Sequence, residues 1–315
     1  RPALGISRIA LPPNSNVPAI VQALQANPKV AAVEPNYAVD VPVPQIPATN
    51  IAQQPTGQPK IATPIGSTRI AILDSGLRLD ASLGNLVSGT FDSTSPGSPI
   101  TDTGGHGTQM AYIASGAIQP TGALPNESPN ANILAIKAFD ENGVASNYGL
   151  IESLNYAQEN GARILSLSWG TENPSAFLKS AFQQAAKNGA LIFAAAGNEP
   201  TGNPVYPAAY PNTIAVAALG ADGTRWEKSN YGEFVDFIAP GHATLPVGNN
   251  GPPGAYQGTS IATPYLANWA SQYASQNPNA SNADILNAIK SSVIDQGPSG
   301  KDPQYGYGTF NQQAA

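Results

Sequence analysis

The sequence predicts an α/β fold built on a mostly parallel sheet that helices cover on both faces. Two observations support this prediction. From about residue 67 onward, short apolar runs alternate with segments of helical length, and the 31 Gly and 30 Pro residues are spread between these runs instead of gathered in one tract. Strand–helix–strand units of this spacing form right-handed crossovers, which give parallel strands buried on both faces.

The elements of this main domain, 67–315, follow in order. Strands are predicted over 67–73, 131–139, 163–168, 190–196, 213–219 and 234–239, and helices over 105–117, 146–160, 174–188 and 259–276. Parallel strands place functional groups beyond their carboxyl ends. Asp74, the run Ser168-Trp169-Gly170 and the pair Gly197-Asn198 each follow a different strand, so we expect them along one rim of the sheet.

The N-terminal part differs from this domain. Residues 1–40 predict a small β-α-β appendage, with strands over 4–11 and 30–41 and a helix over 17–26. Such a unit is too small to bury its own core, so we expect it to dock on the main domain. Residues 41–66 are rich in Pro, Gln and Thr and predict a linker or surface wrap. The chain begins at Arg1-Pro2 without Met, so a processed or trimmed start is expected.

Composition excludes several classes of function. The net charge of -6 and the low share of charged residues, 11%, do not favour binding to nucleic acid or anionic lipid. The absence of cysteine excludes disulfides, thiolate catalysis and thiolate metal sites. No apolar run approaches the ~20 residues that a membrane span needs, and the N-terminus shows no signal peptide. We expect a monomer without a membrane span.

Ser260 is the candidate nucleophile. It lies between a glycine turn and the start of the helix over 259–276, where unpaired N–H groups and the positive end of the helix dipole suit a developing negative charge. By itself the pattern is also that of an ordinary N-cap.

Three further residues carry polar groups in similar places. Asp74 ends a buried apolar strand, where a carboxylate needs a cationic or N–H partner, although an Asp can also simply open a turn. His106 is flanked by glycines and could be that partner or a structural histidine. Asn198 could hold a turn or donate to an oxyanion. His242, on a probable loop without a motif, is expected to be non-catalytic.

The order Asp, His, Asn, Ser carries the resemblance to a known family. The segments Ala71-Ile72-Leu73-Asp74-Ser75-Gly76, Gly105-His106-Gly107-Thr108, Ala195-Ala196-Gly197-Asn198 and Gly258-Thr259-Ser260-Ile261-Ala262-Thr263-Pro264 resemble the signature blocks of the subtilisin-like serine proteases, or subtilases. The resemblance implies a three-layer α/β/α fold and a serine endopeptidase, made as a zymogen and exported.

The resemblance also implies roles for individual residues. His106 would act as general base, Asp74 would hold its imidazole, and Asn198 with the Ser260 N–H would form the oxyanion hole. Substrate would run between Ser168-Trp169-Gly170 and Ala195-Ala196-Gly197, with Trp169 either a pocket wall or a core aromatic. Ala208 stands where the family has Gly, and its methyl group is expected to narrow the first specificity pocket.

The sequence departs from the family at three positions beside these blocks. Gln109 replaces a second His, and Ile261 and Tyr265 replace the usual Met and His. The loop by which many relatives bind structural calcium is not matched over 117–125, and catalysis is expected to need no cofactor and no metal. A structural Ca²⁺ stays possible but has no support in the sequence.

Residues 29–39, especially Val30 and Val33-Glu34-Pro35-Asn36-Tyr37, resemble the end of the inhibitory propeptide of this family. The partners implied are protein or peptide substrates and the chain's own N-terminal segment, as intramolecular chaperone and inhibitor, with a cleavage between Tyr37 and Gln45. The alternative is an inactive binding protein whose cleft residues 1–66 occupy permanently. An α/β-hydrolase esterase is disfavoured, because the Ser260 block lacks the last glycine of G-x-S-x-G.

Overall fold

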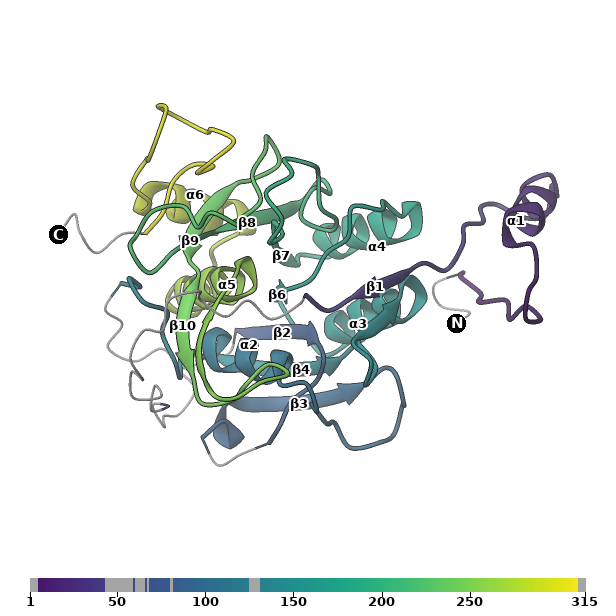
Figure 1. The fold of residues 1–315 in the computed structure, drawn as a ribbon, viewed down its shortest axis with the longest axis horizontal. Coiled ribbons are helices and arrows are strands. Elements are labelled where there is room, and N and C mark those ends of the chain that lie inside the picture. The colour runs from purple at the N-terminus through teal and green to yellow at the C-terminus, as the bar shows by residue number, and fades with distance from the viewer. Residues whose placement is uncertain are drawn as a thin grey trace.

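The computed structural model describes residues 5–42, 59, 66, 68–79, 82–124 and 131–310. Its centre is a sheet of seven parallel strands (Figure 1). In sheet order these are β3 (Val87–Asp92), β4 (Asn132–Lys137), β2 (Arg69–Asp74), β6 (Ile164–Leu167), β7 (Leu191–Ala195), β8 (Thr213–Leu219) and β9 (Phe237–Pro240). The predicted α/β fold with a parallel sheet is confirmed.

Helices cover both faces of this sheet and make it the middle of three layers. One face carries α2 (His106–Ala114) and α5 (Thr259–Gln276), with α6 (Asn282–Ser292) packed on α5. The other face carries α3 (Asn147–Glu159) and α4 (Ala176–Lys187), which pack on each other (Figure 1). Each face has its own apolar cluster, because the central strands are buried on both sides.

Besides the N-terminal strand described below, three short strands and one turn of the described residues lie outside the main sheet. β10 (His242–Leu245) and β11 (Gly254–Gln257) form an antiparallel hairpin, and β5 (Val144–Ser146) precedes α3. A 3-10 turn, η2 (Gly84–Leu86), leads into β3. Each of these strands has three or four residues, too few for a clear period of two in the sequence.

The N-terminal segment differs from the predicted β-α-β appendage, so that prediction is wrong in part. A helix, α1 (Val17–Gln25), forms where expected, but residues 5–11 form no strand, and of 30–41 only β1 (Ala38–Asp40) is a strand. β1 pairs antiparallel with β5 of the main domain, and α1 has no buried residue. Figure 1 shows α1 projecting from the body beyond β1. The predicted linker over 41–66 lies largely outside the described residues.

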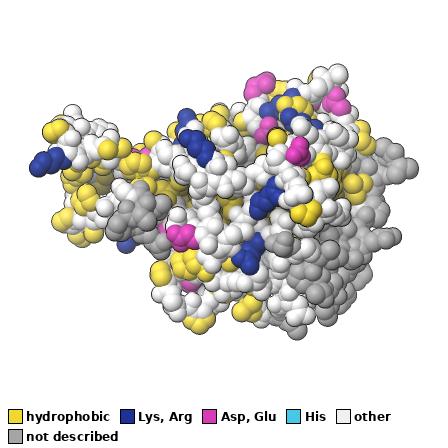
Figure 2. All heavy atoms as spheres, turned by 180° about the vertical axis from the view of Figure 1, so that it is seen from behind, with side chains coloured by type: hydrophobic (Ala, Val, Ile, Leu, Met, Phe, Trp, Pro, Cys, Tyr) yellow, Lys and Arg dark blue, Asp and Glu magenta, His cyan; other side chains and the backbone are white. Residues whose placement is uncertain are grey.

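The surface of the described residues agrees with the composition. On the face drawn in Figure 2, Lys and Arg side chains are scattered among uncharged ones and form no single basic patch. Within the described ranges, no helix is both long and apolar enough to cross a membrane.

Candidate active site

The predicted site residues lie where the central strands end and two helices begin. Asp74 is the last residue of β2, and His106 is the first residue of α2. Ser260 is the second residue of α5. Ser168 directly follows β6, and Asn198 follows β7. Because β2, β6 and β7 are neighbours in the sheet, their carboxyl ends share one rim, as the sequence predicts.

Asp74 and His106 are in direct contact. His106 Nδ1 lies 2.7 Å from Asp74 Oδ1, and both side chains are almost fully buried. The same oxygen accepts the backbone N–H of Ser75 at 2.7 Å. A carboxylate can only accept, so Nδ1 carries the proton and Nε2 keeps a lone pair that can take up another.

The charges around His106 favour its protonated form. Burial by itself lowers the pKa of His106, but the charge of Asp74, its hydrogen bond and the charge of Asp102 together raise that pKa above the ordinary 6.5. The surroundings therefore stabilise an imidazolium, the form that a general base reaches once it has taken a proton.

Asp102 is a residue of this site that the sequence reading missed. Its Oδ1 accepts from the Ser75 hydroxyl at 2.8 Å and the Gly105 N–H at 2.9 Å. Its Oδ2 accepts from Thr108, and the Ser75 hydroxyl in turn accepts the Gly107 N–H at 2.9 Å. One buried carboxylate thus fixes the turn on both sides of His106. The available signal was an Asp just before the glycines of that turn.

Ser260 does not cap its helix. The N-cap of α5 is Gly258, which has no side chain to offer, and Ser260 lies inside the first turn. The Ser260 hydroxyl donates to the carbonyl oxygen of Ser168 at 3.2 Å, and the Ser168 hydroxyl donates to the carbonyl oxygen of Ser260 at 3.0 Å. The hydroxyl therefore makes no hydrogen bond with His106 here. Backbone N–H groups of a first turn have no acceptor within their own helix.

Asn198 is held by the same turn. Its Oδ1 accepts from Thr259 twice, from the backbone N–H at 2.9 Å and from the hydroxyl at 2.8 Å. The amide nitrogen Nδ2 lies beside Gly258, where a Cβ on that glycine would come within 3.3 Å of it. No hydrogen bond within the described part of the chain uses Nδ2, so it can donate to a bound group.

The residues predicted to bind substrate lie in two strand extensions. Ala195 ends β7, and Ala196 and Gly197 continue it. Asn230 holds these two, because its Nδ2 donates to the Ala196 carbonyl at 3.1 Å and its backbone N–H donates to the Gly197 carbonyl at 2.9 Å. Gly170 lies in the extension of β6 and, as a glycine, has no side chain. The extension of β6 lies beside Ser260, whose hydroxyl donates to the Ser168 carbonyl.

Two of the predicted binding residues are core side chains. Trp169 is 1% exposed, donates from Nε1 to the Leu73 carbonyl at 2.9 Å, and meets Phe139 edge to face. It therefore takes the core alternative. Ala208 is 2% exposed and belongs to the same apolar cluster.

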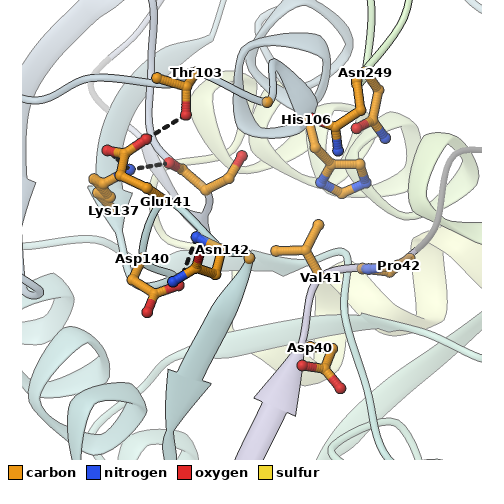
Figure 3. Close-up of a pocket in the computed structure, with 14 residues that line it drawn as sticks. Asp40, Val41, Pro42, Thr103, His106, Lys137, Asp140, Glu141, Asn142 and Asn249 are labelled. Carbon is orange, nitrogen blue, oxygen red and sulfur yellow. Dashed lines mark hydrogen bonds and ion pairs between the residues drawn. The ribbon is translucent and has the colours of Figure 1, made fainter.

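The end of the described N-terminal segment reaches the site. Val39 pairs with Ala145 of β5, and the Val41 N–H donates to the Gly143 carbonyl at 2.8 Å. Beyond them is a cavity of about 470 Å³, lined by Val41 and Pro42 on one side and His106 on the other. Figure 3 shows Val41 and His106 projecting into it. An extended strand beside His106 has the geometry of a bound peptide.

Two of the three departures from the family pattern, Gln109 and Tyr265, make structural contacts of their own. Gln109 donates from Nε2 to the Val247 carbonyl at 2.7 Å and so holds the loop after β10. The Tyr265 hydroxyl accepts the Leu124 N–H at 3.2 Å, and its ring packs edge-on against Phe310. Neither side chain occupies the position of Asp74, His106 or Ser260.

The segment after α2 is tied down by hydrogen bonds. Thr121 donates its N–H to the His242 carbonyl at 2.7 Å, and its hydroxyl lies 3.0 Å from His242 Nδ1. Among the described residues, no group of three or more His, Cys, Asp or Glu side chains could hold a metal ion.

Comparison with known proteins identifies the family. The model of the Subtilase family matches residues 66–308, and the chain belongs to this family. It is 34% identical over 303 residues to alkaline elastase YaB of Bacillus sp. (strain YaB), covering 95% of this chain and 77% of that one. It is 35% identical over 251 residues to subtilisin Savinase of Lederbergia lenta, covering 78% and 90%.

Among solved structures, a lanthipeptide protease has 25% identity and a TM-score of 0.65, covering 79% of this chain and 87% of its own. The predicted three-layer fold and the predicted class are confirmed, and the chain is a serine endopeptidase of the subtilase family.

Proposed function

We propose that this endopeptidase cleaves peptide bonds through an acyl-enzyme on Ser260, with His106 as general base and Asp74 as its partner. The contact of 2.7 Å between His106 Nδ1 and Asp74 Oδ1 carries the proposal, because it leaves Nε2 ready to accept a proton. The Ser260 hydroxyl rotates away from the Ser168 carbonyl toward Nε2. Such hydrogen bonds often form only when substrate is bound.

The remaining steps follow from the neighbouring groups. Ser260 Oγ attacks the substrate carbonyl while its proton passes to His106 Nε2, and the new oxyanion takes hydrogen bonds from Asn198 Nδ2 and the Ser260 N–H. His106 then gives its proton to the leaving amine. Water, deprotonated by His106, cleaves the ester in the same way and restores Ser260. These steps use groups of the chain and water, and we infer that they need no cofactor.

Labelling with a serine-directed fluorophosphonate tests this assignment. We expect the wild type to label with one equivalent and Ser260→Ala not to label. Ser271→Ala is the matched control, because Ser271 lies in the same helix and its hydroxyl donates only to the Thr68 carbonyl. It should label like the wild type. Labelling that survives Ser260→Ala would refute the role of Ser260.

We also propose that the N-terminal segment is the chaperone and inhibitor of this site until it is cut. Two contacts support this, in addition to the pairing of β1 with β5. Glu34 accepts the N–H groups of Ala176 and Phe177 at the start of α4, at 3.0 and 3.4 Å. Asn36 accepts the Tyr148 N–H at the start of α3, at 3.0 Å. Both helices thus receive a cap from the segment.

The length of the match to alkaline elastase YaB supports the same proposal, because 303 aligned residues extend into the part before residue 66. Labelling separates a zymogen from a permanently inhibited protein. N-terminal sequencing of the labelled species should find a start between Tyr37 and Gln45. A labelled species that starts at Arg1 would refute the cleavage, and a wild type that never labels would favour the inactive binding protein.

Membership of the subtilase family is the basis for three further proposals. The substrates are proteins and peptides, the enzyme acts outside the cytoplasm, and the working form is a monomer. Fractionating cells that express the full-length gene tests the location, and light scattering of the labelled enzyme tests the monomer. Dialysis against a chelator tests calcium, and we expect no change in the melting temperature, since the described residues offer no cluster of acidic ligands.

A further inference from the structure

Four asparagines of this chain are followed directly by glycine, a pair of residues that can react with each other. The pairs are Asn142-Gly143, Asn160-Gly161, Asn188-Gly189 and Asn250-Gly251. The backbone nitrogen of the glycine can attack the side-chain carbonyl carbon of the asparagine, because glycine has no side chain to hinder the approach. Which of the four pairs reacts depends on how the fold holds each of them.

In three of the pairs the attacking nitrogen is held by a hydrogen bond. Each of these glycines donates its N–H at 3.0 Å to the carbonyl oxygen three residues earlier, Gly143 to Asp140, Gly161 to Gln158 and Gly189 to Ala186. The side-chain amides of Asn160 and Asn188 also donate, each at 2.9 Å. These turns have to open before the nitrogen can reach the side chain.

The fourth pair, Asn250-Gly251, is not held in this way. Both residues are exposed and lie in the irregular loop 246–253 between β10 and β11. Among the described residues, neither the Gly251 N–H nor the Asn250 side chain makes a hydrogen bond. Asn250 also has a φ of 49°, in the left-handed region where a residue with a side chain is strained. The two reacting groups therefore have no hydrogen bond of the described fold to break before they meet.

We propose that Asn250 is a modification site, at which the folded enzyme loses a side-chain amide spontaneously. The Gly251 nitrogen bonds to Cγ of Asn250, and the amide nitrogen leaves as ammonia with the proton that the Gly251 nitrogen gives up. Water then opens the cyclic succinimide at either of its carbonyl carbons. The product is a carboxylate, as aspartate or as isoaspartate.

The position of Asn250 gives this reaction a consequence for the turn that carries His106. The Asn250 N–H donates to the Gly104 carbonyl at 2.8 Å. A Cβ on Gly105 would come within 2.1 Å of the Gly248 carbonyl oxygen, so the loop and the turn are in close contact. Isoaspartate routes the backbone through an additional carbon at this contact, and the loop then no longer holds Gly104 in the same way.

The new carboxylate also enters acidic surroundings. Asn250 lines the cavity of about 470 Å³ that His106 also lines, and the other charged residues around it are Asp40, Asp140, Glu141 and Lys137 (Figure 3). Lys137 is already paired with Glu141 at 3.1 Å. We therefore expect the modification to lower catalytic activity, a consequence that rests on the proposed role of His106. The loss of the amide itself does not rest on that role.

Peptide mapping of the full chain with Ser260→Ala tests the site without self-digestion. The folded protein is kept in mildly alkaline buffer, and the four pairs are followed by their mass and by enzymatic methylation of isoaspartate. We expect Asn250 to lose its amide about 3- to 10-fold faster than the other three asparagines, the scale of one hydrogen bond. In urea, where no pair is held, the four rates should converge.

Gly251→Ala, added to the same chain, hinders the reaction at its source. The backbone of Gly251 is not left-handed, and the nearest atom that a Cβ would meet is the Tyr256 hydroxyl oxygen at 3.3 Å, so alanine needs only a small shift. The variant should slow amide loss at Asn250 and leave the other three pairs unchanged, which makes them controls within one digest. A melting curve checks its fold, and the comparison of the four pairs stands without it.

Activity tests the consequence for catalysis. Wild type aged in the same buffer should lose kcat/KM per active site, counted by fluorophosphonate titration, in step with the modified fraction of Asn250. The Gly251→Ala enzyme should lose it more slowly. A failure of the proposed function would show as absent labelling, and the rates of amide loss would still decide the modification site.

Three results would overturn the proposal. They are amide loss at Asn250 that is no faster than at the other pairs of the folded chain, an equal lead of Asn250 in urea, and an unchanged rate at Asn250 in folded Gly251→Ala. A constant kcat/KM while Asn250 becomes modified would overturn the consequence for catalysis.

Discussion

Asp102 holds Thr108 through one carboxylate oxygen, Oδ2, which accepts the Thr108 N–H at 2.8 Å and its hydroxyl at 2.6 Å. The other oxygen holds Ser75 and Gly105. Four donors thus meet one buried carboxylate around the turn that carries His106. The carboxylate is itself buried, so we expect it to act through the position and charge of His106.

Asp102→Asn should weaken this turn. The amide places N–H groups where two donors already point, which we expect to cost about 2 kcal/mol of stability. The substitution should also lower kcat/KM and shift the acid midpoint of the pH profile of kcat/KM to lower pH. The reason is that the charge of Asp102 helps to raise the pKa of His106. Asp92→Asn is the matched control, since Asp92 is a buried carboxylate that only orders Thr94 and Ser95. It should lose stability without shifting the midpoint.

The raised pKa of His106 predicts the acid limb of the pH profile. Activity needs neutral His106, so kcat/KM should fall as pH decreases through a midpoint above 6.5. For stability the sign is opposite. The contribution of protonated His106 is fully present below the unfolded value of 6.5 and is lost as pH rises through the folded pKa. A pH profile of kcat/KM with a midpoint below 6.5 would contradict the assignment of the base.

Glu34 predicts how tightly the N-terminal segment binds. A synthetic peptide of residues 29–42 should inhibit the processed enzyme, and its Glu34→Gln form should bind about 5- to 10-fold more weakly, the scale of a lost helix cap. A peptide with Lys29→Gln is the control, because the Lys29 side chain is exposed. Equal inhibition constants for the Glu34→Gln and parent peptides would show that the caps do not contribute to binding.

His242 predicts a loss of stability in acid. Burial lowers its pKa below 6.5, so its contribution is full above that value and is lost as pH falls through the folded pKa. The melting temperature should therefore fall between pH 8 and pH 5 by less in His242→Asn than in the wild type. His106→Asn, which alters the only other histidine, should keep the fall. If the melting temperature of His242→Asn falls between pH 8 and pH 5 as much as that of the wild type, groups other than His242 cause the fall.

Features with local causes could be predicted from the sequence. Helix α5 occupies the predicted range 259–276, because Gly258 precedes it and most of its residues are buried, which outweighs the presence of Pro264 inside the helix. The central strands were found because burial on both faces makes each of them a plain apolar run. Asp74, His106, Asn198 and Ser260 stand beside glycine turns, where short motifs are easiest to recognise.

Features that depend on a distant partner could not be predicted. Residues 5–11 have the composition of a strand but no neighbouring strand to pair with, whereas β1 forms because β5, more than 100 residues away, offers an edge. Helix α6 was missed although Ser281 and Asp284 form a capping box at its start. Asp102 carries no motif, and its importance lies only in what surrounds it.

The pairing of β1 with β5 has a kinetic consequence. Under the proposed function, the covalently attached segment meets the site at an effective concentration set by the tether, on the order of millimolar, so its cleavage would be first order and independent of how dilute the enzyme is. Once cut, the segment would be an ordinary solute. Dilution would then lower its occupancy of the site, so release into a large volume would favour proteolysis.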